Sequence, residues 1–160
     1  MLSGGGLCGA IHKAGGEELV TACNQLYKEN KKYSVGSALV TVAGKLRCHY
    51  VIHAVGPKWH EHEDKAAPLI ATYQSILQRA DELKVTSLSI PAISTGIHKY
   101  PAELAAKIAL GFLTEAMPNY MHLQNILIVC ANKENADAYG KAYQELAKNS
   151  VQVIDLIPNI

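Results

Sequence analysis

Glycines near the start of the chain are the first residues whose spacing could serve chemistry. Residues 3–16 (SGGGLCGAIHKAGG) hold six of the twelve glycines, and Gly4, Gly6 and Gly9 satisfy G-x-G-x-x-G. Glycines at this spacing let backbone N–H groups approach a pyrophosphate closely. The segment therefore predicts a phosphate-binding loop that leads into a helix.

The same loop does not fit a dinucleotide-binding Rossmann unit. That unit places a strand before the glycines and an acidic residue about 20 positions later to hold the ribose. Only two residues precede Ser3, and the corresponding later stretch, residues 24–29, lies within a predicted helix. A lone glycine motif also occurs in ordinary turns, so it is weak evidence by itself.

A second loop with similar chemistry follows a predicted strand at residues 87–93 (SLSIPAI). In this loop Ser94 and Thr95 supply hydroxyl groups, Gly96 allows close backbone approach, and the next amides can form an anion-binding nest. In open α/β sheets, ligands bind beyond the carboxyl ends of strands. Two such loops could hold a pyrophosphate from both sides.

Other reactive side chains have simpler interpretations. His60 and His62 lie beside acidic residues, but no third ligand is placed at a spacing typical of zinc, so a solvated loop is favoured and no metal is expected. His53 alternates with apolar residues, as a hydrogen-bonded core histidine does, whereas His12 could face either the core or the cleft. Cys8 could be activated by a helix N-terminus, although packing is the favoured role.

The chain length predicts one domain spanning residues 1–160. Fifteen basic and fourteen acidic residues leave no field that would attract nucleic acid or a membrane. Four widely spaced cysteines and no signal peptide predict a reducing compartment, cytoplasmic or nuclear. No apolar run reaches the ~18 residues of a membrane-spanning helix. No cofactor is expected, and the oligomeric state is left open.

Alternating β-type and helical patterns predict the elements that position these loops. Helices are expected at residues 17–32, 66–83, 101–117 and 134–148, and strands at 37–42, 48–55, 87–93, 125–130 and 151–156. The run NILIVC at 125–130 is continuously apolar, as in a central strand buried on both faces. Pro91 predicts an end or a bulge in its strand. The class is α/β, with helices on both faces of a mixed sheet.

Three segments, in this order and spacing, resemble the macrodomain family, the ADP-ribose-binding module. They are GGGLCGAIHKAGG, VIHAVGPKW at 51–59 and IPAISTGIHKYP at 90–101. The sequence is most similar to macrodomains of poly-ADP-ribose polymerases and of viruses, as far as about Lys148. The resemblance implies a three-layer α/β/α fold with a mixed central sheet.

The resemblance also implies a ligand site. One loop would line the distal ribose and the diphosphate, and the other would bind the phosphates from the opposite side. His98 stands where many members have an aromatic residue that covers the ligand, and the residues after 125–130 would border the adenosine. The implied ligand-binding residues are Gly4, Gly5, Gly6, Leu7, Cys8, Ser94, Thr95, Gly96, Ile97, His98, Ala131 and Asn132.

Departures from the family pattern bear on activity. Members usually have an aspartate-bearing strand and a buried strand ending in Asn-Ala-Ala-Asn before the glycine loop, so this chain is incomplete or permuted relative to them. Cys8 occupies a position where one hydrolase branch has aspartate. We therefore expect ADP-ribose binding, with weak or absent hydrolysis and no assigned catalytic residue. The alternatives are removal of mono-ADP-ribose from acidic side chains, and a scaffold that binds no ligand.

The end of the chain offers a replacement for a missing strand. Residues 151–156 (VQVIDL) are the remaining β-type segment, and Asp155 loosely matches the family's adenine-binding aspartate. We expect this segment to pair within the sheet and to bring Asp155 near the adenine end of the cleft, in its own chain or in a swapped partner. An edge strand far from the ligand is the alternative.

Overall fold

Helices and strands alternate along the chain. The computed structural model describes residues 6–29, 33–59 and 66–148. The strand predicted at residues 151–156 lies outside these ranges. The elements are α1 (Gly6–Glu29), β1 (Ala38–Val42), β2 (Tyr50–Ala54), α2 (Ala66–Glu82), β3 (Ser87–Pro91), α3 (Ala102–Ala116), a 3-10 turn (Met117–Asn119), β4 (Asn125–Val129) and α4 (Lys133–Ala147).

Helix α1 begins eleven residues earlier than the sequence predicts. The glycine-rich segment is helical from Gly6, and Gly16, with φ 74°, divides α1 into two parts. Glycine weakens a helix, but His12 and Gly15 of the first part are buried, so tertiary packing compensates for the low propensity. The part of the predicted glycine loop that the structure describes, from Gly6 onward, is therefore helical.

The described strands form two ladders of two strands each. β1 pairs with β2 in antiparallel orientation, and β3 pairs with β4 in parallel orientation, with Ile90 opposite Ile128. The expectation that β4 is central is wrong for the described residues, because β4 pairs with β3 alone and Val129 is 49% exposed. Pro91 ends β3, which confirms one of its two predicted roles.

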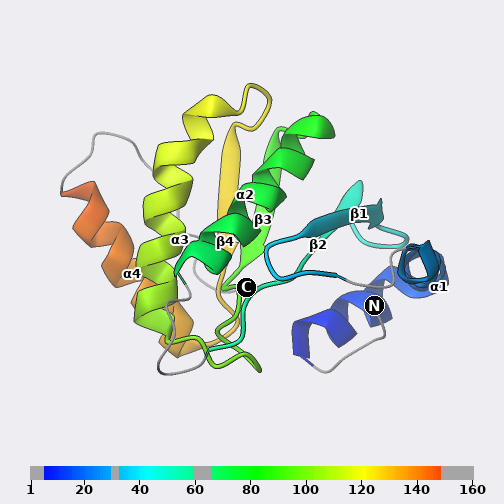
Figure 1. Ribbon diagram of the computed structural model, residues 1–160, viewed down its shortest axis with the longest axis horizontal. Helices are drawn as coiled ribbons and strands as arrows, with labels where there is room; N and C mark the ends of the chain where they lie inside the picture. Colours follow the sequence, from blue (N-terminus) through cyan, green and yellow to red (C-terminus); the bar gives the residue numbers. More distant parts are fainter. Residues whose placement is uncertain (1–5, 30–32, 60–65, 149–160) are drawn as a thin grey trace.

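Helices cover both faces of this layer, as the α/β/α prediction requires (Figure 1). On β1 and β2, Thr41 and His53 face α1, where His53 meets Cys23. Ala38 and Ile52 lie on the opposite face, in the same core cluster as residues of α2, α3 and α4. The structure is therefore three-layered, with α1 on one side and the other three helices together on the other.

Helix α2 packs its buried face between the first ladder and α3. It contacts β1, β2 and α3, and its residues Leu69, Tyr73 and Leu77 have no exposed surface. The Tyr73 hydroxyl lies 3.2 Å from that of Tyr139 in α4. Burial raises the pKa of Tyr73 well above its usual value and that of Tyr139 to about 12, so both remain neutral.

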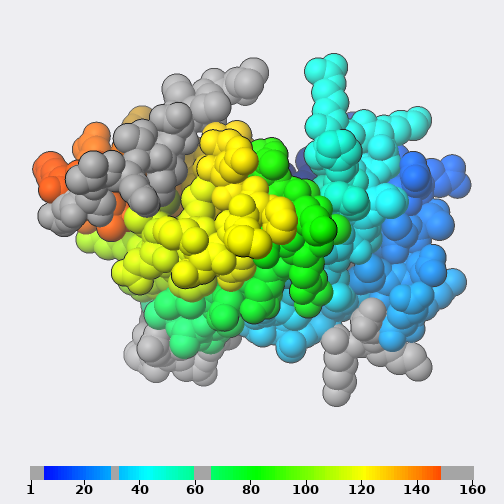
Figure 2. All heavy atoms as spheres, turned by 90° about the horizontal axis from the view of Figure 1, so that it is seen from above, coloured from blue at the N-terminus to red at the C-terminus, as the bar shows by residue number. Residues whose placement is uncertain are grey.

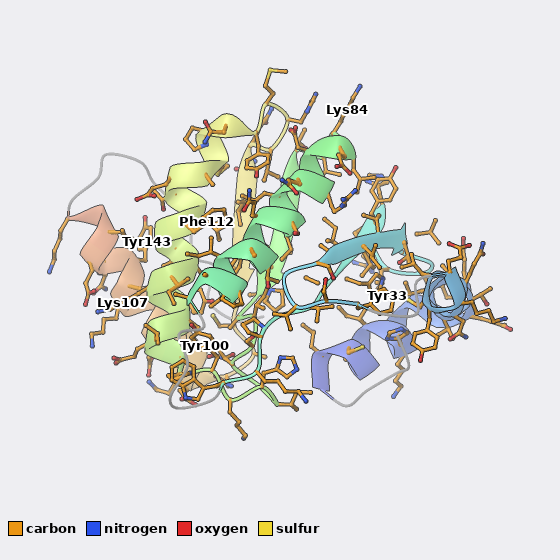
Figure 3. All side chains as sticks on the ribbon, viewed as in Figure 1. Tyr33, Lys84, Tyr100, Lys107, Phe112 and Tyr143 are labelled. Atoms are coloured by element: carbon orange, nitrogen blue, oxygen red, sulfur yellow. The ribbon has the colours of Figure 1, made fainter. Side chains whose placement is uncertain are left out.

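Away from this core, the two ladders carry separate surface features. Viewed from above, the connection between β1 and β2 (cyan) stands apart from the segment that precedes β4 (yellow) (Figure 2). In the view of Figure 3, Tyr100 lies at the lower end of the molecule, close to the start of α3.

Within the described ranges, no helix is long and apolar enough to cross a membrane.

Candidate functional site

The candidate site lies at the edge where three strands end. β3 and β4 are parallel, so the residues that follow Pro91 and Val129 emerge at one edge. Gly56, after β2, packs so closely on Ser94 that a Cβ atom there would collide with the Ser94 hydroxyl. The loops after β2, β3 and β4 therefore share this edge, the usual ligand position in open α/β sheets.

The loop after β3 is held in one conformation by its own hydrogen bonds. The Thr95 hydroxyl donates to the Ala92 carbonyl at 2.9 Å, and the Tyr100 amide donates to the Ser94 carbonyl at 3.0 Å. Ser94 has φ 67°, a left-handed conformation that costs a residue other than glycine free energy. Such strain is often found at functional sites, and here it turns the chain sharply after β3.

Three successive backbone amides in this loop are available to a ligand. The N–H groups of Gly96, Ile97 and His98 donate to no acceptor among the described residues. Ile97 is 86% exposed, and a Cβ atom at Gly96 would meet nothing within 4 Å. Free amides on a fixed, open loop are suited to bind the oxygens of an anion such as phosphate.

Residues outside the predicted site support this loop. The Trp59 amide donates to the His98 carbonyl at 2.8 Å, and the Trp59 ring meets the Tyr100 ring with centroids 4.9 Å apart. Trp59 belongs to a family motif in the sequence, but only the fold reveals that it positions His98.

The other predicted loop begins α1. Gly6 has φ 65°, Leu7 is 51% exposed, and Cys8 is half-buried. The first turn of α1 lies on the same lower side of Figure 1 as the loops after β3 and β4. Its free N–H groups and the positive end of the helix dipole favour an anion nearby.

His12 faces the core, one of the two possibilities that the sequence leaves open. It is 5% exposed, and its Nδ1 atom lies 2.8 Å from the Cys8 carbonyl oxygen and 3.5 Å from the Cys8 sulfur. Since a carbonyl only accepts, Nδ1 holds the proton. Nε2 is then an acceptor, and it is buried without a partner among the described residues.

Ala131 and Asn132, predicted to border the adenosine, lie at the same edge after β4. Both are exposed, and the Asn132 side chain accepts a hydrogen bond from the Asn135 amide at 2.8 Å as the N-cap of α4. Asn132 therefore has a structural role in addition to any contact with a ligand. Gly4, Gly5, Asp155, His60 and His62 lie outside the described residues.

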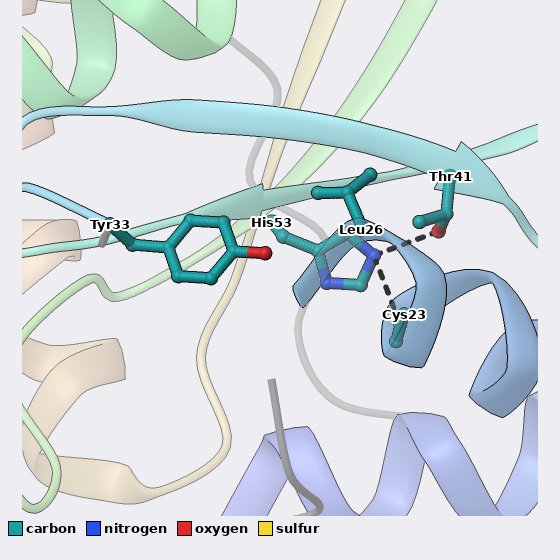
Figure 4. A pocket seen from close by; sticks show the side chains of 5 residues that line it. All are labelled: Cys23, Leu26, Tyr33, Thr41 and His53. Carbon is teal, nitrogen blue, oxygen red and sulfur yellow. Dashed lines mark hydrogen bonds between the residues drawn. The ribbon is translucent and has the colours of Figure 1, made fainter. Parts of the chain in front are cut away.

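A small pocket lies beneath α1, away from these loops (Figure 4). Its cavity volume is about 10 Å³, and it is lined by Cys23, Leu26, Tyr33, Thr41 and His53. His53 Nε2 is 2.8 Å from the Thr41 hydroxyl, which confirms the predicted hydrogen-bonded histidine. Burial, aided by repulsion from His12, lowers the pKa of His53 to about 4. No cluster of metal-ligating side chains occurs in the described part of the chain.

The chain is similar to known proteins both in sequence and in fold. The Macro domain family model matches residues 1–109. A Klebsiella pneumoniae protein named O-acetyl-ADP-ribose deacetylase is 41% identical over 142 residues, covering 88% of this chain and 81% of its own.

Two solved structures share the fold. The Oceanobacillus iheyensis macrodomain with ADP superposes with a TM-score of 0.86 at 30% identity, covering 93% of this chain and 80% of its own. The Trypanosoma brucei macrodomain in complex with ADP-ribose has a TM-score of 0.77 at 29% identity, with 88% and 57% covered.

Proposed function

This chain belongs to the macrodomain family, and we propose that it binds ADP-ribose, either free or as a mono-ADP-ribose modification on proteins. The observation that supports this most directly is the row of free amides at Gly96, Ile97 and His98, on a rigid loop where three strands end. A diphosphate offers acceptor oxygens for these donors. The similarity to a macrodomain solved with ADP-ribose supports the same ligand.

The diphosphate binds between the two loops. Ser94 to His98 hold it from one side, and the first turn of α1, with Gly6, Leu7 and Cys8, approaches from the other side, together with Gly4 and Gly5. Ile97 and Leu7, both exposed apolar side chains, cover the ligand. The adenosine lies toward Ala131 and Asn132, with Asp155 as a further proposed contact.

Binding is tested by calorimetry with ADP-ribose on the full chain. Gly96→Glu places a carboxylate where the phosphates bind, so we expect binding to be abolished. Gly140→Glu is the matched control, because Gly140 also has nothing within 4 Å of a Cβ atom but lies on α4. AMP and ATP should compete poorly, since neither has the distal ribose. Unaltered affinity in Gly96→Glu contradicts the site.

Hydrolysis of ribose esters is the second candidate function. The names of the deacetylases to which this chain is 35–41% identical favour it. O-acetyl-ADP-ribose and ADP-ribosylated acidic side chains are both carboxylic esters of a ribose hydroxyl, so one site could accept either. Cys8 replaces the aspartate of the hydrolase branch, and we expect weak turnover at most.

Two measurements separate these functions from a scaffold without a ligand. Release of acetate from O-acetyl-ADP-ribose, and of ADP-ribose from modified protein, distinguishes an enzyme from a binding module. Absence of any calorimetric signal with ADP-ribose supports the scaffold.

We place the protein in a reducing compartment, cytoplasmic or nuclear, because all four cysteines are free thiols.

A further inference from the structure

His98 is the one residue of the loop 94–98 whose side chain can gain a charge near neutral pH. Its backbone is held by hydrogen bonds on two sides. The Trp59 amide donates to the His98 carbonyl at 2.8 Å, and the Lys99 amide donates to the Gly96 carbonyl at 3.0 Å. His98 therefore occupies a central position of a closed turn, and its side chain is anchored at a fixed place beside the candidate site.

The imidazole of His98 is close to the position where an anion would bind. The His98 amide is one of the three free donors, so a phosphate oxygen bound to it lies about 2.9 Å from the amide nitrogen. The imidazole belongs to the same residue and is within reach of the same phosphate, inside the roughly 4–6 Å over which an opposite charge favours a protonated group. The ring has no hydrogen-bond partner among the described residues.

Cations and a thiol are the other titratable groups that adjoin this loop. Lys58, in the loop after β2, and Lys99 are both exposed, and neither forms an ion pair with a described carboxylate. On the facing side of the candidate site, the first turn of α1 has no acidic residue, and Cys8 is its titratable side chain. These elements offer His98 no negative partner.

The described carboxylates at this edge lie on α3 and α4. Glu103, at the start of α3, is 3.2 Å from the Lys141 ammonium group. Glu134 lies in the first turn of α4, beyond the residues predicted to border the adenosine. Neither carboxylate pairs with His98, so the anion that would meet a charged imidazole has to come from the ligand.

We propose that His98 contacts the diphosphate in its protonated form, so that ADP-ribose binding takes up a proton from solvent. The inference rests on the proposed function and specifies the charge state in which the loop recognises its ligand. A pyrophosphate diester keeps both negative charges between about pH 6 and 8, so the proton is gained by the protein. The affinity therefore rises as the pH falls through the range in which histidine titrates. A neutral ring that only covered the ligand would give an affinity independent of pH.

Calorimetry with ADP-ribose on the full chain at pH 6 and pH 8 tests the proposal. We expect binding to be about threefold tighter or more at pH 6, as for a partly exposed charge pair. His98→Phe keeps a flat ring and His98→Gln keeps a polar group, but neither can gain a proton, so both should lose this dependence. His49→Gln is the matched control, because His49 is exposed in the connection between β1 and β2 and should retain it.

Two further histidines, His60 and His62, follow Trp59 in the sequence and lie outside the described residues. His60→Gln and His62→Gln should also retain the pH dependence. The proposal is overturned if either variant loses the dependence while His98→Gln keeps it.

Proton uptake in the unmodified protein gives a second readout that needs no variant. Calorimetry near pH 7 in two buffers of different ionisation enthalpy should show a net gain of protons on binding. Release of protons, or no exchange at all, overturns the proposal. Binding with the same affinity at both pH values overturns the role of His98 alone, whereas no binding at either pH contradicts the proposed function as well.

Discussion

Protonation of His53, which lies beneath α1, makes the free energy of unfolding depend on pH. Its pKa falls to about 4 when the chain folds, whereas an unfolded histidine titrates near 6.5. The unfolded state therefore binds the proton first. The stabilisation is complete above about pH 6.5 and is lost progressively as the pH falls toward 4. We expect His53→Gln to lose less stability over this window than the unaltered chain, by up to about 3 kcal/mol.

The measurement is urea unfolding at pH 7 and at pH 4.5 for both proteins. Glutamine retains a polar group that can meet the Thr41 hydroxyl but has no proton to gain in this range. Equal pH dependence in the two proteins would show that His53 is not the titrating group. Cys23, also beside His53, adds nothing to this window, because burial raises the pKa of its thiol.

At the scale of elements, the loops after β2 and β3 pack so closely that one added methyl group at Gly56 would clash with its neighbours. Gly56→Ala forces a Cβ atom against the Ser94 hydroxyl and the Ile93 side chain. We expect a loss of about 1–3 kcal/mol in the free energy of unfolding, as for overpacking elsewhere, together with weaker ADP-ribose binding. Gly111→Ala is the control, since its Cβ atom would meet nothing and alanine favours α3.

Chemical denaturation and calorimetry on both variants measure these effects. A Gly56→Ala protein as stable as the original, with unchanged affinity, would show that the two loops adjust independently. Gly111→Ala should be neutral or stabilising by up to about 1 kcal/mol.

Helix α4 depends on a residue that the sequence assigns to the ligand. Asn132→Ala removes the acceptor of the Asn135 amide, and we expect it to cost about 1 kcal/mol of stability. Asn132→Asp keeps an acceptor oxygen at the cap and should retain that stability. Thermal unfolding without ligand measures the cap alone. If Asn132→Ala unfolds at the original temperature, the cap contributes nothing.

Local patterns predicted most elements because they depend on neighbouring residues. The four-residue spacing of Leu69, Tyr73 and Leu77 predicts α2 to within one residue of its end. The same reasoning missed the first part of α1, where burial of His12 outweighs the low helix propensity of glycine. Gly96 could be predicted as a ligand-loop residue because glycine allows close backbone approach. The contact of Gly56 with Ser94 could not be predicted, because it joins residues far apart in the sequence and leaves no local pattern.

At the scale of the whole molecule, the division into two ladders determines which part opens first. No ladder bond joins β2 to β3 among the described residues, and the links between the two parts run through α2 and the loops. Examples are the bond from the Thr72 hydroxyl to the Val55 carbonyl and the bond from the Trp59 amide to the His98 carbonyl. The part with fewer core residues should therefore open at a lower free energy than the other.

That part is β1, β2 and α1, since the core cluster draws mainly on α2, α3, α4 and the second ladder. We expect its amides to exchange faster than those of β3 and β4, with opening free energies lower by about 1–3 kcal/mol, within the range of sub-global opening. ADP-ribose at the proposed site between α1 and the loop after β3 should reduce the difference, because a ligand that needs both parts stabilises their association. Gly96→Glu should keep the difference and lose the response to ligand. Equal exchange of both ladders without ligand would mean that the molecule opens as one cooperative unit, with the loop contacts and α2 sufficient to couple the two parts.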